Sequence, residues 1–185
     1  MEKKINQRVA LTKRLVQEGL LRLLKKESIE TINVSELCRE AGINRATFYK
    51  HYYSPHDVLS EIERNVVADL DLAQYRVLPK ESATNVSRLE GMCAYLKENS
   101  MTVCTLVKCK VDSDLSKVFV NVPNDALGII EKSTRFDEKN RGLVACFLSF
   151  GLYSLIIKWL VEDIPLTPKE IANLIDDLSK RGWIS

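Results

Sequence analysis

Residues Asn33 to Tyr52 read NVSELCREAGINRATFYKHY, and this stretch decides the fold. Asn33 and Glu36 have the spacing of a helix-capping pair, and helices often end on a left-handed glycine such as Gly42. Asn44 can cap a second helix directly after this turn. Two short helices joined by a tight turn that contains glycine, behind a longer supporting helix, describe a helix-turn-helix.

The segments on either side of this stretch are also predicted to be helical. From residue 7 to residue 26, apolar side chains recur at three- and four-residue steps and basic side chains surround them. Ser54 and Pro55 can start another helix, because proline is harmless at the first helical position. Residues 1–53 are thus predicted to form a compact three-helix unit, which a long helix ties to the rest of the chain. The apolar stripe expected along that long helix is Val58, Ile62, Val66, Leu70 and Leu72.

The remainder of the chain shows helical patterns and no convincing strand alternation. One clear helix is predicted from roughly Lys139 to Val161, and the last from Pro168 to Arg181. The last helix begins with the capping box of Thr167 and Glu170, and Gly182 follows it as a stop. We therefore expect an all-α fold. Further breaks are expected at Pro79, Pro123 and Pro165.

The charge of the chain is unevenly distributed along its length. Residues 1–56 hold 11 Lys and Arg against 6 Asp and Glu, a balance of +5, whereas residues 57–185 hold 16 against 19, a balance of −3. The overall composition, with 45% hydrophobic and 28% charged residues, is that of a soluble globular protein. A basic head on a mildly acidic body suggests that the head has an anionic partner.

The cysteines and the apolar stretches indicate the compartment. Five cysteines form an odd set without a C-x-x-C spacing, and the charged N-terminal segment does not resemble a signal peptide. We therefore expect a cytoplasmic protein in which all five cysteines are buried apolar residues. The uncharged stretch from Leu143 to Ile157 has 15 residues, whereas a membrane span needs about 20. It is predicted to be a buried helix, and no membrane partner is expected.

The second short helix of the motif carries the side chains that suit nucleic acid. Such a helix fits the DNA major groove with its N-terminal residues nearest the base edges. Arg45 can bond a guanine edge, and Thr47 can offer a hydroxyl to a base or a methyl to thymine. Ser35 lies near backbone N–H groups that favour phosphate. The side chains that can donate to phosphates are Tyr49, Lys50 and His51. The side chains expected to face inward and fix the turn are Leu37, Ala41, Ile43 and Phe48.

The stretch from Asn33 to Tyr52, followed by SPHDVLSEI, resembles the DNA-binding head of TetR/AcrR transcriptional regulators. The sequence departs from the family pattern at Tyr52, where phenylalanine is usual. It also departs at Pro55, where many relatives carry a lysine that contacts phosphate. The positions that match the pattern are Ala41, Gly42, Ile43, Thr47, Tyr49 and His51. The C-terminal run FGLYSLIIKWLVEDIPLTPKEIANLIDDL is similar, less specifically, to a TetR-type C-terminal domain.

This resemblance implies a transcriptional regulator, most often a repressor, that binds a pseudo-palindromic operator as a homodimer. Residues 1–55 would form the DNA-binding domain, with the helix-turn-helix at 33–52. Residues 56–185 would form a helical bundle that binds an unknown small-molecule effector and dimerises. The last two predicted helices, 139–161 and 168–181, would contribute half of an intermolecular four-helix bundle.

Two alternatives for the regulatory input stay open at this stage: a partner protein in place of a small molecule, and oxidation of cysteines. No Ser/His/Asp, Cys/His or carboxylate set has catalytic spacing, and the chain has only 2 histidines, so no enzyme activity, metal or cofactor is expected. The residues that bind an effector are not assigned. Aromatic and sulfur side chains that suit a pocket suit the core equally well, namely Tyr95, Cys104, Phe119, Phe147 and Phe150.

Overall fold

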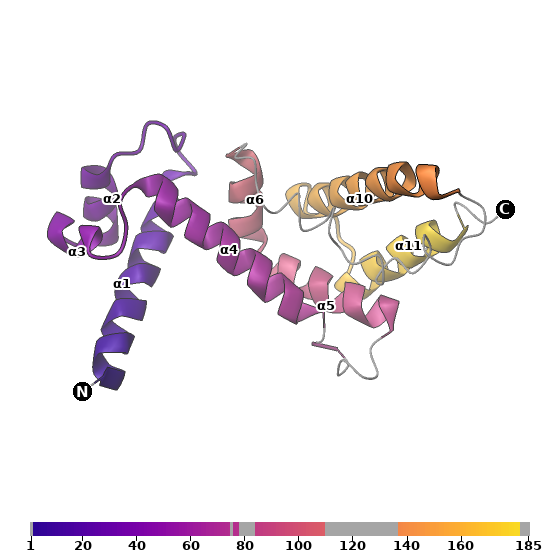
Figure 1. Ribbon diagram of the computed structural model, residues 1–185, viewed down its shortest axis with the longest axis horizontal. Helices are drawn as coiled ribbons and strands as arrows, with labels where there is room; N and C mark the ends of the chain where they lie inside the picture. The colour runs from indigo at the N-terminus through magenta and orange to yellow at the C-terminus, as the bar shows by residue number, and fades with distance from the viewer. Residues whose placement is uncertain (1, 75, 78–83, 110–136, 182–185) are drawn as a thin grey trace. The chain divides into compact units, whose positions relative to one another are not determined.

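The computed structural model describes residues 2–74, 76–77, 84–109 and 137–181 (Figure 1). These residues form helices, turns and loops without a strand, so the expected all-α fold is confirmed. The helices are α1 (Glu2–Leu23), α2 (Val34–Ala41), α3 (Arg45–Tyr49), α4 (Pro55–Ala73), α5 (Asn85–Glu98), α6 (Ser100–Lys108), α10 (Glu138–Val161) and α11 (Pro168–Arg181).

The chain divides into two compact units. The first unit comprises Met1–Asn65 with Thr105–Val111, and the second comprises Val66–Cys104 with Asp112–Ser185. The division falls inside α4, whereas the sequence placed a domain boundary at the start of that helix. A boundary of function at residues 55 and 56 therefore stays a prediction.

The turn between α2 and α3 has the predicted construction. The Asn33 side chain accepts a hydrogen bond from the backbone N–H of Glu36 at 3.0 Å, which caps α2. Gly42 ends α2 with a φ of 67°, a left-handed conformation that glycine adopts without steric cost. The Asn44 side chain then accepts from the N–H of Thr47 at 2.7 Å and caps α3. The spacing of these residues leaves α3 almost directly after α2.

The core of the first unit fixes the angle between these helices. Leu37, Ala41 and Phe48 are buried as predicted, and Ile43 is half-buried. At the crossing of α1 and α2, a Cβ on Gly19 would lie 3.3 Å from the Cβ of Ala41, so glycine permits a close approach of the two helices. The predicted stripe of α4 is buried at Val58, Ile62, Val66 and Leu70.

Two predicted details of this region are wrong. Helix α1 ends at Leu23 and not at residue 26, because the N–H groups of Lys26 and Glu27 both bond to the carbonyl of Leu23, at 2.8 and 3.1 Å, and close a turn. Leu72 is 70% exposed near the end of α4, whereas the pattern placed it on the buried stripe.

In the second unit, α5 packs against the end of α4. Thr84 and Ser87 form a reciprocal capping box at the start of α5. A Cβ on Gly91 would lie 2.2 Å from the carbonyl oxygen of Ala73, so this crossing requires glycine. The buried side chain of Gln74 accepts hydrogen bonds from the Arg88 guanidinium at 3.0 and 2.7 Å and joins the two segments further.

Helices α10 and α11 follow the predicted boundaries closely. Trp159 is buried, and its indole N–H donates to the carbonyl of Leu166 at 3.0 Å in the connecting loop. Thr167 and Glu170 form the predicted capping box of α11, and Pro165 lies in the predicted break. The break expected at Pro79, that at Pro123 and the stop at Gly182 lie outside the described residues.

The expected burial of all five cysteines is confirmed at two positions, is only partly met at two more and is wrong at one. Cys38 and Cys93 are buried, Cys104 and Cys109 are half-buried, and Cys146 is exposed. Cys146 lies on α10, where a row of apolar side chains is also exposed. The stretch from Leu143 to Ile157, predicted to be a buried helix, is therefore covered on one side only.

Candidate DNA-binding surface

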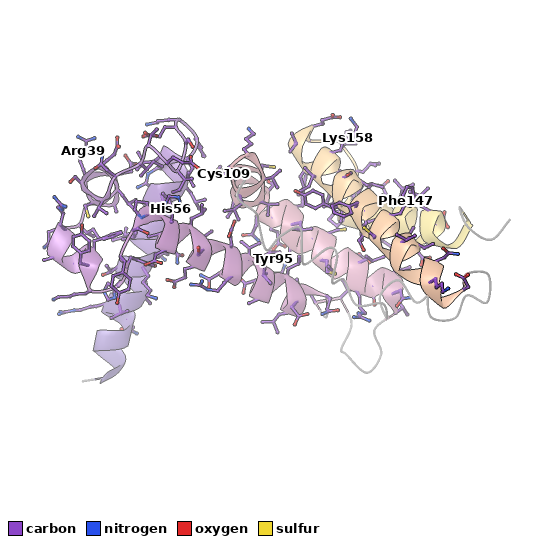
Figure 2. The ribbon with its side chains drawn as sticks, turned by 45° about the horizontal axis from the view of Figure 1, so that its top comes forward. Arg39, His56, Tyr95, Cys109, Phe147 and Lys158 are labelled. Atoms are coloured by element: carbon purple, nitrogen blue, oxygen red, sulfur yellow. The ribbon has the colours of Figure 1, made fainter. Side chains whose placement is uncertain are left out.

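Helix α3 and the turn that follows it bring five of the predicted contact residues together. Arg45, Tyr49 and Lys50 are exposed, and Thr47 and His51 are half-buried. The sixth predicted residue, Ser35, is exposed in the first turn of α2. Arg39 on the same helix is a further exposed basic side chain of the first unit, and it is labelled in Figure 2.

Arg45 and Tyr49 lie one helical turn apart and contact each other. The guanidinium Nη2 of Arg45 donates to the Tyr49 hydroxyl at 3.4 Å, and its Cζ atom lies 6.0 Å from the centre of the ring. This hydrogen bond is the main reason why the pKa of Arg45 lies above its ordinary value. The contact keeps a permanent positive charge on the exposed face of α3 and orients it along the helix.

Phe48 anchors this surface from below. Its ring is fully buried and meets the Tyr49 ring edge-on, with the centroids 5.6 Å apart. It also contacts the Tyr52 ring, whose centroid is 5.7 Å away. One side of Tyr49 is thus held by the core while its hydroxyl is displayed, which is the arrangement that a contact with a fixed phosphate requires.

The connection from α3 to α4 forms a second tight junction. The N–H of Asp57 donates to the Ser54 hydroxyl at 3.2 Å, and the Asp57 carboxylate accepts from the N–H of Tyr53 at 2.9 Å. Pro55 stands at the first position of α4, as predicted, and its side chain is buried, so it offers no polar group to DNA.

Sequence reasoning missed two exposed side chains next to the predicted set. Tyr53 is 87% exposed directly after Tyr52, and His56 is exposed in the first turn of α4 (labelled in Figure 2). The sequence contains a feature that could have indicated each of these residues. Tyr53 is a large aromatic residue between a buried ring and a helix cap, and His56 is one of only 2 histidines in the chain.

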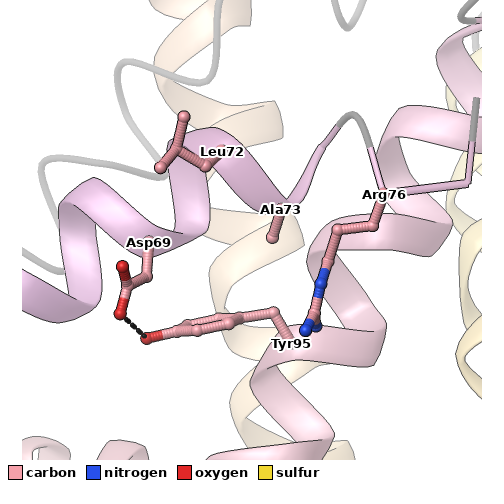
Figure 3. Close-up of a pocket in the computed structure, with 5 residues that line it drawn as sticks. All are labelled: Asp69, Leu72, Ala73, Arg76 and Tyr95. Carbon is pink, nitrogen blue, oxygen red and sulfur yellow. Dashed lines mark hydrogen bonds between the residues drawn. The ribbon is translucent and has the colours of Figure 1, made fainter. Parts of the chain in front are cut away.

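The second unit contains an open pocket of about 330 Å³, lined by Asp69, Leu72, Ala73, Arg76 and Tyr95 (Figure 3). The Tyr95 hydroxyl donates to the Asp69 carboxylate at 3.4 Å, and burial is the main cause that raises the pKa of Tyr95 to about 12. Arg76 is paired with Glu98 at 2.8 Å. Because the polar groups already have partners, the pocket alone does not identify a ligand.

The other side chains that suit a pocket or the core lie in different surroundings. Phe147 and Phe150 are exposed on α10, Cys104 is half-buried on α6, and Phe119 lies outside the described residues. Within the described part of the chain, no three His, Cys, Asp or Glu side chains are grouped so that they could hold a metal ion.

The C-terminal half of the chain decides the family. The TetR_C_8 model, described as a transcriptional regulator C-terminal region, matches residues 87–181 of the 185. The chain belongs to the TetR family of transcriptional regulators. TetR-family proteins generally bind DNA, act as dimers and are not enzymes. The helix-turn-helix lies outside the matched residues, so the two halves of the chain point to this family independently.

Comparison with individual proteins agrees with this assignment. A segment of 70 residues is 33% identical to the HTH-type transcriptional regulator YxbF of Bacillus subtilis (strain 168). The match covers 37% of this chain but only 18% of that relative.

Solved structures share the fold at low sequence identity. A TetR transcriptional regulator from Streptococcus agalactiae 2603V has a TM-score of 0.72 and 17% identity over 98% of this chain and 100% of the other. The fatty acid degradation regulator FadR from Bacillus halodurans has a TM-score of 0.66 and 13% identity, over 94% of this chain and 96% of the other. The dihydroxyacetone kinase operon activator DhaS has a TM-score of 0.58 and 16% identity, over 91% of this chain and 93% of the other.

One helix in the described part of the chain, Gly142–Val161, is long and apolar enough to cross a membrane by length and composition, and 29% of its most apolar window is buried. A helix whose apolar side packs against a core or another subunit passes the same test. In a member of a family of soluble regulators, this helix is weak evidence for a membrane span.

Proposed function

We propose that this TetR-family protein is a cytoplasmic repressor that binds a pseudo-palindromic operator as a homodimer and responds to a small-molecule effector. The observation that carries the DNA-binding part is the exposed face of α3, where Arg45, Tyr49 and Lys50 project from a helix anchored by the buried ring of Phe48. In this proposal, residues 1–55 bind DNA and residues 56–185 dimerise and bind the effector.

The α3 residues divide into two roles. Arg45 and Thr47 stand at the N-terminal end of the helix and would contact base edges. Tyr49, Lys50 and His51 would contact phosphates, and the Ser35 hydroxyl on α2 would add a further phosphate contact. The net charge of +5 over residues 1–56 supports association with a polyanion.

The exposed apolar surface of the second unit supports the homodimer. The large apolar side chains of α10 and α11 that are at least 41% exposed are Leu143, Phe147, Phe150, Val161, Leu174 and Leu178. A soluble protein rarely leaves such a set in water, and a second copy that presents the same helices would cover it. Dimerisation would also place two copies of α3 on two half-sites of one operator.

The regulatory input and the direction of control have competing possibilities. The structural relative DhaS is an operon activator, which favours activation as the second candidate outcome. A partner protein in place of a small molecule also fits, because the one open pocket described above has its polar groups paired. Cysteine oxidation is less favoured at Cys93, since burial raises the pKa of this thiol to about 12 and keeps it protonated.

Selection of bound duplexes from a random DNA library tests the function directly. We expect an enriched palindromic consensus whose half-sites are separated by one helical turn of DNA or a multiple of it. Repeating the selection in the presence of a metabolite extract should reduce the enrichment if an effector releases the protein. A library without any enriched sequence would contradict the proposed function.

Variants of α3 test the two proposed roles. Lys50→Ala should weaken binding to all duplexes and lower the salt dependence by about one phosphate contact. Arg45→Ala should instead relax the preference at one base position, at a cost of about 1–3 kcal/mol for the preferred duplex. Both are measured by titration of selected and scrambled duplexes at several salt concentrations. Wild-type binding by both variants would rule out α3 as the recognition helix.

A further inference from the structure

The structure gives the hydroxyl of Tyr52 a specific environment. Its ring is buried against Phe48 in the turn that follows α3. The hydroxyl accepts a hydrogen bond from the Gln17 amide of α1 at 3.4 Å. Burial is the main cause that raises the pKa of Tyr52, and the nearby Glu61 carboxylate of α4 raises this pKa further. One side chain thus links the end of the recognition helix to the two helices that flank it.

Lys13 completes this cluster from α1. Its ammonium donates to both carboxylate oxygens of Glu61, at 2.9 and 3.1 Å, and lies 5.5 Å from the centre of the Tyr52 ring. The Lys13 and Glu61 side chains are 35% and 21% exposed, so solvent screens their attraction only in part. The positive charge of Lys13 is therefore neutralised within the unit, where it holds α4 against α1.

We infer that the cluster of Lys13, Tyr52 and Glu61 positions the recognition helix relative to α4 and thereby sets the DNA affinity. This inference rests on the proposed DNA-binding function. A phenylalanine at position 52 would keep the packing on Phe48 but would remove the hydroxyl that bonds to Gln17 of α1 and interacts with Glu61 of α4. Because hydrogen bonds are directional, the hydroxyl narrows the range of orientations that α3 adopts before it meets DNA.

The location of the cluster separates positioning from direct DNA contact. Tyr52 is buried, whereas Tyr49 and Tyr53 are exposed on the same segment. The hydroxyl points into the unit toward Gln17 and Glu61, so its removal deletes no phosphate contact. The effect of its loss should therefore appear in the affinity and not in the number of ions released on binding.

The test compares Tyr52→Phe with wild type by fluorescence titration of the most enriched selected duplex. We expect about three- to tenfold weaker binding, an unchanged slope of affinity against salt, and a thermal midpoint lowered no more than in the control. The control is Tyr95→Phe, which removes the hydrogen bond from the Tyr95 hydroxyl to the Asp69 carboxylate in the second unit. Its length of 3.4 Å equals that of the bond between Gln17 and Tyr52. Tyr95→Phe should bind the duplex like wild type.

A second pair of variants isolates the charge. Lys13→Met should weaken binding more than Arg14→Met, although each removes one positive charge from α1, because Arg14 is exposed and pairs with Glu18 of its own helix, at 3.6 Å. Lys13→Met combined with Tyr52→Phe should weaken binding by less than the product of the two single effects, since each change disrupts the same cluster.

Lys50→Ala distinguishes failure of this inference from failure of the proposed function. If Lys50→Ala weakens binding while Tyr52→Phe and Lys13→Met bind as tightly as wild type, the positioning role is wrong and the DNA-binding face stands. If Lys50→Ala also leaves the affinity unchanged, both are overturned. A reduced salt slope for Tyr52→Phe would show direct contact with DNA and would also overturn the positioning role.

Discussion

The two compact units of this protein expose opposite kinds of surface. Around α3 the first unit displays a guanidinium, an ammonium, tyrosine hydroxyls and a histidine, and keeps its apolar side chains inside. Along α10 and α11 the second unit displays leucine and phenylalanine side chains. The first surface suits a hydrated polyanion, and the second suits the same surface of another copy. In the proposed function, the two surfaces would therefore bind different partners, DNA and a second copy of the chain, because their chemistry differs.

The largest expected effects come from the two cores. Phe48 and Trp159 are the largest fully buried side chains of the first and second unit, respectively. Replacing either with alanine should lower the free energy of unfolding by roughly 3–5 kcal/mol, because a large cavity is left. In calorimetry, Phe48→Ala should shift chiefly the transition of the first unit and Trp159→Ala that of the second. An equal shift of a single transition in both variants would show that the units unfold together.

The next effect concerns the apolar surface of α10 and α11. The double substitution Phe150→Glu with Leu174→Glu should convert the dimer to monomers and weaken operator binding by at least about 100-fold, since the two heads are no longer linked. Light scattering and duplex titration measure the two outcomes. Leu72→Glu places one such charge on an apolar residue that is more exposed and lies outside these helices, and it should leave the proposed dimer intact. Dimers that persist in the double variant would move the interface elsewhere.

A smaller effect is expected at the turn of the helix-turn-helix. Gly42→Ala should destabilise the protein by about 1 kcal/mol, because a φ of 67° strains any residue with a Cβ. No atom lies within 4 Å of the position that the Cβ would take, so the cost is one of backbone conformation and not of packing. Gly42→Asn should lose less, since asparagine tolerates this conformation. Denaturant unfolding measures both variants, and equal losses would point to a steric cause.

The smallest effect is a pH dependence above pH 9. Burial raises the pKa of Cys93 from 9.0 to about 12, so the unfolded state releases this proton at a lower pH than the folded state does. Stability is therefore lost as the pH rises from 9 toward 12, by less than about 1 kcal/mol at pH 9.5. Cys93→Ala should flatten the decline of the unfolding free energy in this range. An identical decline would assign it to other groups, of which Tyr95 is the first candidate.

The separation in sequence between interacting residues explains what the sequence could predict. The helix-turn-helix follows from residues only three or four positions apart, such as the Asn33 and Asn44 caps and the αL glycine Gly42, and each has the expected geometry. The Tyr52 cluster brings Lys13 of α1 and Glu61 of α4, which are 48 residues apart, to the turn after α3, so no local pattern reveals it. Leu72 fits the predicted stripe of α4 and is nevertheless exposed, because periodicity identifies an apolar face without identifying what covers it.

The start of α5 shows a second limit. Its capping box has serine at the third helical position, whereas the usual pattern has glutamate or glutamine there, and the sequence therefore left this boundary open. The last helix has the usual glutamate, Glu170, and its start was predicted correctly. Boundaries were thus predictable where capping residues were of the common type.

Amide hydrogen exchange with and without the selected duplex tests the central claim most directly. If α3 is the recognition helix, the duplex should slow exchange over residues 44–53 and at the start of α2 near Ser35. The exposed surface of α10 should be protected already in the free protein, because the proposed dimer would cover it before DNA binds. Protection by the duplex that appeared only in residues 84–109 or 137–181, with α3 unchanged, would contradict the assignment of DNA binding to the first unit.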